Sequence, residues 1–416
     1  MTESRWPSPG GAFGDKTDEF RRYDDVPARD SIVLVTRNFP PMQGGMEWLN
    51  FHIHRALSQI YRVFLVAPKG AETVCPDPAT VRISPALPVW RFLLQSFWQT
   101  LRLTRAVRPR LIVAGSGVAA LPAVLAGRHV GIPVVTYLHG LDIVSAHPGY
   151  RCLFLPAIRR SSAWLANSRF TREAAIQAGL PPERVEILVP GTDLPALNQE
   201  RGTAFRRRLQ AGERPILLSV GRLIRRKGLL EFLERAFPAI VRRRPEVLWV
   251  IIGADPRQSL ARPKVSMAER LRVRVQQLGL EAHVRLLDWE DDRATLGDAF
   301  LASRLHIFPV LNLPGDGEGF GMVAIEAAAH GVPTVAFAVG GIPDAVEPGV
   351  SGELLPSGDY ARMVEVVVKQ LDSPEVPEAI RKACRRHAER YAWPLFGDGL
   401  RAACAKTIAA QRPAGG

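Results

Sequence analysis

The sequence predicts an α/β protein made of two Rossmann-like domains, each with a parallel sheet. The chain has 416 residues, which is enough for two or three domains. Apolar runs typical of buried strands alternate with helical segments, and glycine-rich loops join them. This alternation stops in a charged segment bounded by prolines, residues 195–214, and restarts with an apolar strand at 216–220.

These boundaries predict five segments. We expect a polar leader at 1–30, a first domain at 31–194, a linker at 195–214, a second domain at 215–388 and a last helical segment at 389–416. The leader is charged and rich in proline and glycine, without the apolar stretch of a secretory signal. We therefore expect a cytoplasmic protein.

The composition limits the kinds of site and partner that we expect for this chain. The chain has 54 Lys and Arg against 41 Asp and Glu, a net charge of +13. Its four cysteines are far apart and form no C-x-x-C pair, so we interpret them as reduced thiols and expect no metal site. An acidic cluster at 288–292 could suggest a metal site, but a solvated turn is the simpler interpretation. No recognised nucleic-acid motif accompanies the basic charge, so we expect no nucleic-acid partner.

The first domain begins with a strand–loop–helix–strand unit, which implies a parallel sheet. The apolar strand at 31–36 leads into a loop containing Gly44 and Gly45, then into a helix at 46–58 and a strand at 61–67. Taken alone, the two glycines indicate only a tight turn.

A basic region follows, because residues 78–141 contain seven Arg and no Asp or Glu. Within it, 89–110 has the pattern of an amphipathic helix. Its apolar residues at helical spacing are Trp90, Leu94, Phe97 and Leu101, and the nearby cations are Arg91, Arg102 and Arg105. Such a helix could lie on an anionic membrane surface, or it could pack into the core with arginines on its wet face. The sequence leaves both interpretations open.

A glycine motif follows the strand at 110–114. Residues Gly115 to Ala120 match G-x-G-x-x-A, a dinucleotide fingerprint. The motif lies in the middle of the domain, and the next acidic residue is Asp142, so the expected acid is missing. Close strand–helix packing is the simpler interpretation, with a nicotinamide-dependent oxidoreductase as the alternative from another functional class.

The strand at 133–138 ends in His139-Gly140-Leu141-Asp142. Polar residues at the carboxyl end of a strand in an open parallel sheet lie where ligands bind. A lone histidine is more often structural, so the position of His139 alone does not decide its role. Strands at 162–167 and 185–189 continue the alternation.

In the second domain, the strand at 216–220 runs into a basic loop. Arg222 and Lys227 could converge on one diphosphate, the arginine as a fork and the lysine as a point charge. The alternative is an ordinary basic start to a helix, because Arg225 and Arg226 lie alongside. Further strands are expected at 247–253, 284–287 and 305–310.

The region that follows has the features of an anion site. A glycine-rich loop at 314–321 precedes a helix at 322–330, a strand at 334–338 and a Gly340-Gly341 turn that opens another helix. The first N–H groups of a helix have no partner within it, and the helix dipole adds positive charge there. Without side chains at Gly319 and Gly321, a phosphate could approach the backbone. The candidate backbone contacts are Gly319, Phe320, Gly321, Met322 and Val323.

Two carboxylates flank this helix start. Glu318 lies before it and Glu326 inside it, eight residues apart, so they do not share a helix face. An elongated ligand with phosphates at the helix tip could touch both. A sugar nucleotide has this shape.

These residues resemble a known signature. The run Glu318-Gly-Phe-Gly-x-x-x-x-Glu326, followed by Gly331-x-Pro333 and Gly340-Gly341-Ile342-Pro343, resembles the donor site of retaining GT-B glycosyltransferases of family 4. That family includes phosphatidylinositol mannosyltransferases and cell-envelope glycosyltransferases. The run from Gly221-Arg222 to Lys227-Gly228 resembles its phosphate-binding segment, and H-G-x-D at 139–142 resembles its contact with the reactive face of the donor sugar. The resemblance covers residues 31 to 400.

The resemblance implies a GT-B architecture, in which two domains face a central cleft and the last helix crosses back to the first domain. It implies transfer of a sugar from a UDP-, GDP- or ADP-sugar, with retained configuration and no required metal or cofactor. Lipid-linked or glycan acceptors in cell-envelope or exopolysaccharide synthesis would fit, with the protein peripheral on the inner face of the membrane. A nucleotide-sugar epimerase or hydrolase, or a non-catalytic membrane-associated binding protein, remains an alternative.

The implied site roles follow the motifs. Arg222, Lys227 and the helix tip at Gly321 would stabilise the departing diphosphate, while Glu318 orients the sugar hydroxyls. Glu326 would hold the ribose, and His139 would contact the sugar near the reacting carbon. The remaining implied donor contacts are Gly44, Gly45, Asp142 and Gly221. No side chain is expected to act as a covalent nucleophile.

Overall fold

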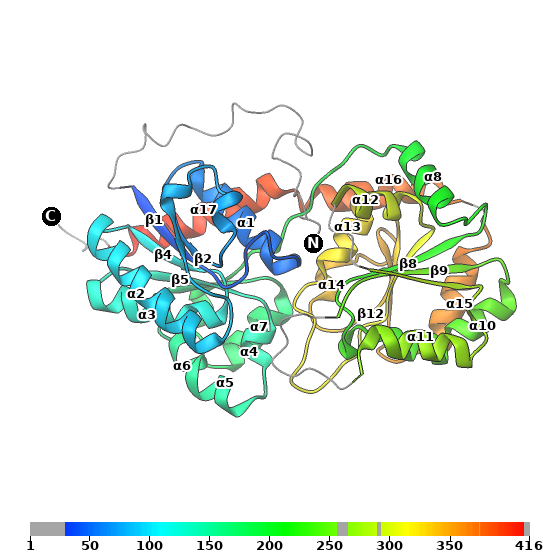
Figure 1. The fold of residues 1–416 in the computed structure, drawn as a ribbon, viewed down its shortest axis with the longest axis horizontal. Coiled ribbons are helices and arrows are strands. Elements are labelled where there is room, and N and C mark those ends of the chain that lie inside the picture. The colour runs from blue at the N-terminus through cyan, green and yellow to red at the C-terminus, as the bar shows by residue number, and fades with distance from the viewer. Residues whose placement is uncertain (1–29, 256–264, 289–292, 374, 412–416) are drawn as a thin grey trace, which may run out of the picture. The chain divides into compact units, whose positions relative to one another are not determined.

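A computed structural model describes residues 30–255, 265–288, 293–373 and 375–411. It divides into two compact units (Figure 1). The first contains the described residues up to Gly191 and those from Trp393 onward, and the second spans Thr192–Ala392. Each unit is an α/β domain with its own parallel sheet.

The sheet of the first unit has seven strands in the order β3-β2-β1-β4-β5-β6-β7 within the described residues. Its strands are β1 Ser31–Val35, β2 Arg62–Ala67, β3 Val81–Ile83, β4 Leu111–Ala114, β5 Val134–Leu138, β6 Ala163–Ala166 and β7 Val185–Ile187. Its helices are α1 Gly45–Ser58, α2 Val89–Val107, α3 Gly117–Val130, α4 Leu141–Val144, α5 Pro148–Leu153, α6 Leu155–Ile158, α7 Arg169–Gln177 and α17 Trp393–Ala409. The strand order reverses at β1 and β4, and a ligand is expected at the carboxyl ends of the strands beside such a point.

The sheet of the second unit has six described strands in the order β10-β9-β8-β11-β12-β13. These are β8 Ile216–Val220, β9 Leu248–Ile252, β10 Val284–Leu287, β11 Leu305–Phe308, β12 Thr334–Phe337 and β13 Gly352–Leu355. The helices are α8 Gln199–Arg208, α9 Leu229–Arg235, α10 Phe237–Arg243, α11 Met267–Gln277, α12 Arg293–Leu301, α13 Met322–Ala329, α14 Ile342–Ala345, α15 Tyr360–Gln370 and α16 Glu378–Glu389. The reversal here lies between β8 and β11.

The prediction of two Rossmann-like parallel-sheet domains is confirmed. The central strands are buried along their whole length and mostly apolar, and helices cover both faces of the sheets, as expected for parallel strands. Figure 1 shows α1 with α17 on one face of the first sheet and α2 with α3 on the other. The short edge strands β3 and β13 are not among the predicted strands.

Side-chain caps explain where several helices begin. Ser116 accepts a hydrogen bond from the backbone N–H of Ala119 at the start of α3, and Ser168 and Asp359 cap α7 and α15 in the same way. By contrast, α13 begins after Gly321, which offers no side-chain cap. No side chain therefore caps its first N–H groups, although Ala324 N donates to the Gly321 carbonyl.

The segment expected to be a linker, 195–214, contains a helix packed into the second unit. Phe205 of α8 is buried in the core of that unit together with Ala211. A Cβ at Gly202 would lie 2.9 Å from the backbone of Leu301, so α8 approaches α12 closely. The exposed arginines of α8 and the prolines that bound the segment gave it the composition of a linker.

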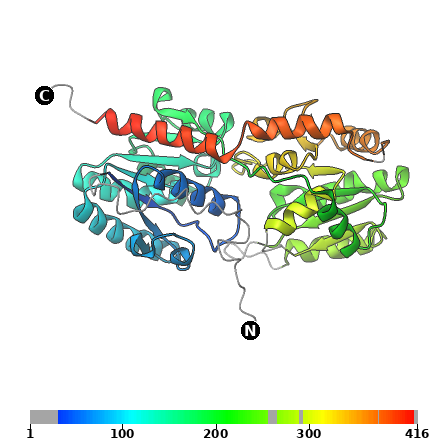
Figure 2. The ribbon, with the colours of Figure 1, turned by 90° about the horizontal axis from the view of Figure 1, so that it is seen from above.

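The last helix, α17, belongs to the first unit. Its apolar side chains Trp393, Phe396, Leu400 and Cys404 are buried, and the helix lies alongside α1 (Figure 2). The ring of Trp393 stacks on His52 of α1 with centroids 3.6 Å apart. Across the described residues, the structure contains no helix with both the length and the apolar character of a membrane span.

Candidate functional site

The main candidate site lies in the second unit, where two loops meet beyond the carboxyl ends of β8 and β11. The loop after β8 contains a 3-10 turn, Arg225–Lys227, and the loop after β11 contains Glu318. Lys227 Nζ donates to Glu318 Oε2 over 2.9 Å. Both side chains are largely buried, 11% and 14% exposed. The two loops are therefore joined by a buried ion pair.

A third side chain completes this cluster. Arg226 Nη1 contacts the same oxygen of Glu318, and Arg226 Nε lies 2.9 Å from Asp316 Oδ1. The Lys227 ammonium also lies 4.7 Å from the centre of the Phe308 ring, in cation–π contact. Two cations thus surround one carboxylate in a setting with little water.

Burial and neighbouring charges shift the pKa values of Lys227 and Glu318. Burial is the largest influence on Glu318 and alone would raise its pKa, but Lys227 and Arg226 outweigh it and hold the pKa at about 2. Burial also lowers the pKa of Lys227, against the opposing attraction of Glu318. Glu318 is therefore a carboxylate at neutral pH. An anion arriving at Lys227 would compete with it.

Arg222 and Lys227, which were predicted to bind one diphosphate, differ in burial. Arg222 is exposed, and its charge acts through space on both Lys227 and Glu318. The arginine that the structure brings to Glu318 beside Lys227 is Arg226. In the sequence, Arg226 fits an ordinary basic start to a helix, and neither Arg226 nor Asp316 is among the predicted site residues. The position of Arg226 next to Lys227 in the sequence was the one sign that it belongs to the site.

Glycines shape the loop that holds Glu318. Gly341 N donates to the carbonyl of Glu318 over 2.8 Å, and a Cβ at Gly341 would lie 2.0 Å from the Gly319 carbonyl oxygen. Gly321 has φ +93°, and its Cβ would lie 2.9 Å from the Phe308 ring. The Gly-Gly turn after β12 therefore supports the loop directly, because only glycine permits this approach.

The other predicted donor contacts lie along the same loop and helix. Phe320 is buried with its ring 5.9 Å from Tyr391, so its backbone rather than its side chain is available to a ligand. Met322 and Val323 are half-buried in the first turn of α13, and Glu326 is half-buried further along the helix. Gly221 has φ +141°, and a Cβ there would lie 3.5 Å from Lys227 Cε. It leaves space beside the lysine.

In the first unit, His139 follows β5 and is anchored on two sides. Its Nε2 lies 2.8 Å from the carbonyl oxygen of Gly115, and its backbone N–H donates to Asp142 Oδ2 over 3.1 Å. Tyr150 donates its hydroxyl hydrogen bond to Asp142 Oδ1 over 3.2 Å. Asp142 thus fixes the turn that follows β5.

The loop after β1 contains Gly44 and Gly45 and leads into α1. Gly44 has φ +145°, and a Cβ there would collide with the carboxylate of Glu47, 2.3 Å away. Asn38 donates to Glu47 over 2.6 Å, which holds that carboxylate under the loop. Arg37 lies near Glu47 and Asp142, and burial lowers its pKa against their attraction. Neither Arg37 nor Glu47 is among the predicted site residues.

The dinucleotide-like motif serves packing. A Cβ at Gly115 would lie 1.9 Å from Asn50 Oδ1, and one at Gly117 would lie 2.7 Å from the Tyr150 hydroxyl. These side chains fill the space in which a pyrophosphate would lie in a dinucleotide site. The structure favours the simpler interpretation of Gly115 to Ala120.

The described residues contain no cluster of three or more His, Cys, Asp or Glu that could hold a metal ion. The acidic cluster at 288–292 falls outside the described residues except for Asp288. The four cysteines are free thiols.

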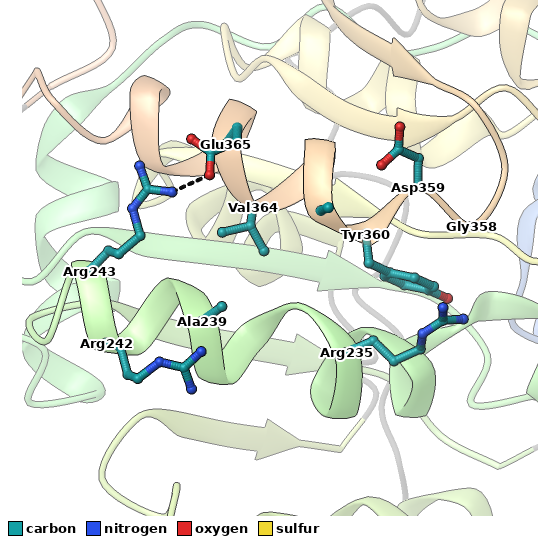
Figure 3. Close-up of a pocket in the computed structure, with 10 residues that line it drawn as sticks. Arg235, Ala239, Arg242, Arg243, Gly358, Asp359, Tyr360, Val364 and Glu365 are labelled. Carbon is teal, nitrogen blue, oxygen red and sulfur yellow. Dashed lines mark hydrogen bonds and ion pairs between the residues drawn. The ribbon is translucent and has the colours of Figure 1, made fainter.

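A separate pocket of about 630 Å³ lies between α10 and the start of α15 (Figure 3). Its arginines do not converge. Arg243 pairs with Glu365, Arg242 points away from α15, and Arg235 lies 4.4 Å from the centre of the Tyr360 ring. This pocket contains none of the predicted site residues.

Comparison with known proteins identifies the family. Residues 200–387 match the family model described as glycosyl transferases group 1, and residues 43–195 match that of glycosyltransferase family 4. A D-inositol 3-phosphate glycosyltransferase of Catenulispora acidiphila is 31% identical over 66% of this chain and 67% of its own. The chain belongs to the family 4 glycosyltransferases.

Two other proteins match over greater lengths. A GDP-mannose-dependent alpha-(1-6)-phosphatidylinositol monomannoside mannosyltransferase of Mycolicibacterium smegmatis is 28% identical over 89% of this chain and 97% of its own. The solved structure of HepE from Anabaena in complex with UDP-glucose superposes with a TM-score of 0.75 at 21% identity, covering 91% of this chain and 99% of that one. At this identity the structural likeness shows the GT-B fold alone.

Proposed function

We propose that this family 4 glycosyltransferase moves a hexosyl group from a nucleotide-diphosphate sugar to a lipid-linked or glycan acceptor, with retained configuration. The observation that supports this most directly is the buried Lys227–Glu318–Arg226 cluster at the loop before α13. It combines cations for a diphosphate with a carboxylate for sugar hydroxyls. The relatives named above act on inositol phosphate or use GDP-mannose, and HepE was solved with UDP-glucose, which supports this donor class.

In the proposed reaction, Lys227, Arg222 and the first N–H groups of α13 bind the diphosphate. Negative charge grows on the diphosphate as the bond from the sugar C1 to its oxygen breaks, and these groups favour that state. Glu318 accepts hydrogen bonds from the sugar hydroxyls, and Glu326 from the ribose. His139 is assigned to the sugar by its motif.

The acceptor hydroxyl forms the new bond to C1 on the face that the diphosphate leaves. Its proton passes to the departing phosphate oxygen, so that no side chain needs to become covalently attached. This front-face route retains the configuration at C1 and needs neither a metal ion nor a cofactor. It also predicts that a carboxylate contacting the sugar acts by orientation.

A thermal-shift screen with UDP-, GDP- and ADP-sugars tests the donor class. A ligand that binds the native state at 100 times its Kd stabilises it by about 2.7 kcal/mol. One nucleotide class should raise the Tm of the wild type and shift that of Lys227→Ala much less. Equal shifts in both proteins, or no shift with any donor, would contradict the assignment.

Product analysis with the donor so identified tests the reaction. NMR of the product should show transfer to an acceptor with the donor's anomeric configuration. Sugar epimerised in the absence of any acceptor would instead support the epimerase alternative, and free sugar as the sole product the hydrolase.

We further infer that α2 contacts an anionic membrane surface. Trp90, Leu94 and Trp98 are 58%, 54% and 54% exposed, and their spacing of four residues places them on one side of the helix. Leu101, which the sequence analysis grouped with the apolar stripe, is buried and faces the core. Arg91 lies over the Trp90 ring at 5.2 Å, where it can reach headgroups while the ring enters the interface.

Liposome co-sedimentation tests this contact. The protein should bind phosphatidylglycerol vesicles more strongly than phosphatidylcholine vesicles, with weaker binding at high salt. Trp90→Ser/Trp98→Ser should reduce binding, whereas Leu395→Ser, an equally exposed apolar residue of α17, should not. Binding that is insensitive to salt, or equal loss in both variants, would contradict the inference.

A further inference from the structure

The family motif contains Lys227, but the structure places a second side chain between the two loops. Arg226 lies in the 3-10 turn Arg225–Lys227, and its side chain is only 8% exposed, whereas Arg225 is exposed. The turn rests on the chain that follows β11. Leu311 N donates to the Arg226 carbonyl over 2.8 Å, and a Cβ at Gly228 would lie 1.9 Å from the Pro309 carbonyl oxygen. The backbone of Arg226 is therefore fixed relative to the donor loop, residues 309–321 between β11 and α13, which contains Glu318.

From this origin, Arg226 holds two points of the donor loop. Its Nη1 contacts Glu318, and its Nε forms an ion pair of 2.9 Å with Asp316. The two acids are two residues apart in the loop, and one guanidinium lies against both, through a hydrogen bond from Nη1 to Glu318 and an ion pair without hydrogen-bond geometry from Nε to Asp316. Lysine, a single point charge, cannot reproduce this fork. Asp316 is more exposed than Glu318, 38% against 14%, so it anchors the outer side of the loop.

Lys227 and Arg226 are suited to different tasks. Lys227 contacts Glu318 and the Phe308 ring, and the side-chain-free Gly221 beside it leaves room for a phosphate. Arg226 is occupied by two carboxylates of the loop. When a diphosphate takes Lys227 from Glu318, Arg226 still holds the carboxylate in place.

We infer that Arg226 is a positioning residue that holds Glu318 and its loop in the orientation needed to bind the donor sugar. The inference rests on the proposed function. Arg226 acts on the sugar through Glu318, whereas Lys227 acts on the diphosphate. Substitution of Arg226 should therefore weaken the binding of a nucleotide sugar more than the binding of the nucleoside diphosphate alone.

The test compares Kd values measured by calorimetry for UDP, GDP or ADP and for the matching glucose or mannose nucleotide. The main variant is Arg226→Lys, which keeps the charge and removes the fork. Its Kd for the sugar nucleotide should rise about tenfold, the loss expected for a hydrogen bond to a charged group, while its Kd for the nucleoside diphosphate stays within about threefold. Arg225→Lys, on the adjacent exposed residue, should leave both Kd values unchanged.

A double-mutant cycle shows whether Arg226 acts through Glu318. In a Glu318→Gln background, Arg226→Lys should have little further effect on the Kd of the sugar nucleotide, because the two side chains form one unit. Asp316→Asn should shift the ratio of the two Kd values in the same direction as Arg226→Lys, and it serves as the test if Arg226→Lys fails to fold. Additive effects, or wild-type ratios in both Arg226→Lys and Asp316→Asn, would overturn the inference.

The outcomes also separate this inference from the proposed function. A wild type that binds none of the nucleotides would remove both. A wild type that binds and turns over its donor, with an Arg226→Lys variant that weakens UDP, GDP or ADP as much as the sugar nucleotide, would assign Arg226 to the diphosphate and overturn the positioning role alone.

Discussion

Gly340→Ala should disturb the donor loop by pushing on its backbone. Gly340 follows β12 with φ +57°, and a Cβ there would lie 2.3 Å from the carbonyl oxygen of Glu318. Because this neighbour is backbone, it cannot turn aside as a flexible side chain would. To restore ordinary contact the loop must move by most of an ångström, and Glu318 must move with it.

Gly349→Ala is a matched control for this substitution. Gly349 has φ +73°, and nothing lies within 4 Å of the position a Cβ would take. Both substitutions place alanine in the left-handed region, which costs about 1–2 kcal/mol. Gly340→Ala adds an overpacking cost of about 1–3 kcal/mol. That difference corresponds to a Tm about 2–12 °C lower for a unit of this size.

Differential scanning calorimetry of the two variants measures the difference, and calorimetric titration with the identified nucleoside diphosphate shows its effect on the site. Gly340→Ala should melt lower than Gly349→Ala and bind the nucleotide more weakly, whereas Gly349→Ala should bind like the wild type. Equal melting temperatures together with equal affinities would show that the loop yields without cost, and would refute this reasoning.

Three other predictions concern the site itself. Lys227→Ala and Glu318→Ala should each lower turnover by about 10²–10³ with the circular dichroism of a folded protein, as expected for lost transition-state contacts, while Arg225→Ala retains activity. Because the folded pKa of Glu318 is lowered to about 2, its charge stabilises the fold above the ordinary carboxyl pKa of about 4.3, and this contribution is lost as the pH falls toward 2. Melting curves recorded between pH 5 and pH 2 should therefore fall more steeply for wild type than for Glu318→Gln. His139→Ala should lower kcat more than it weakens nucleoside diphosphate binding, and an equal loss of both would place His139 at the diphosphate instead.

Much of the fold could be predicted from the sequence because the central strands are mostly apolar runs that alternate with glycine loops and helices. The strand at Ile216–Val220 was predicted with its observed bounds, and the helix from Met322 was predicted to within one residue. The edge strands Val81–Ile83 and Gly352–Leu355 were missed. They are short and only partly buried, so their residues lack the apolar pattern that marks a central strand.

The roles of the site residues stay a prediction, but the structure brings two of them, Lys227 and Glu318, into contact. These two residues and the loop glycines could be proposed from the sequence because each depends on one residue type at a set position. Arg226 could not be distinguished from Arg225 by sequence, since the two are chemically identical neighbours. Only the 3-10 turn decides that one is buried against Glu318 while the other faces solvent.

The first unit is built from two chain segments that are far apart in the sequence, and this affects how it folds during synthesis. Its final helix, Trp393–Ala409, is separated from the rest of that unit by all of Thr192–Ala392, yet it supplies buried side chains against Gly45–Ser58. On the ribosome, this apolar surface of the first unit stays uncovered until Thr192–Ala392 and then the helix Trp393–Ala409 have been synthesised. Chains released before Trp393 should therefore contain a complete second unit and an incomplete first unit, whose uncovered apolar surface binds chaperones.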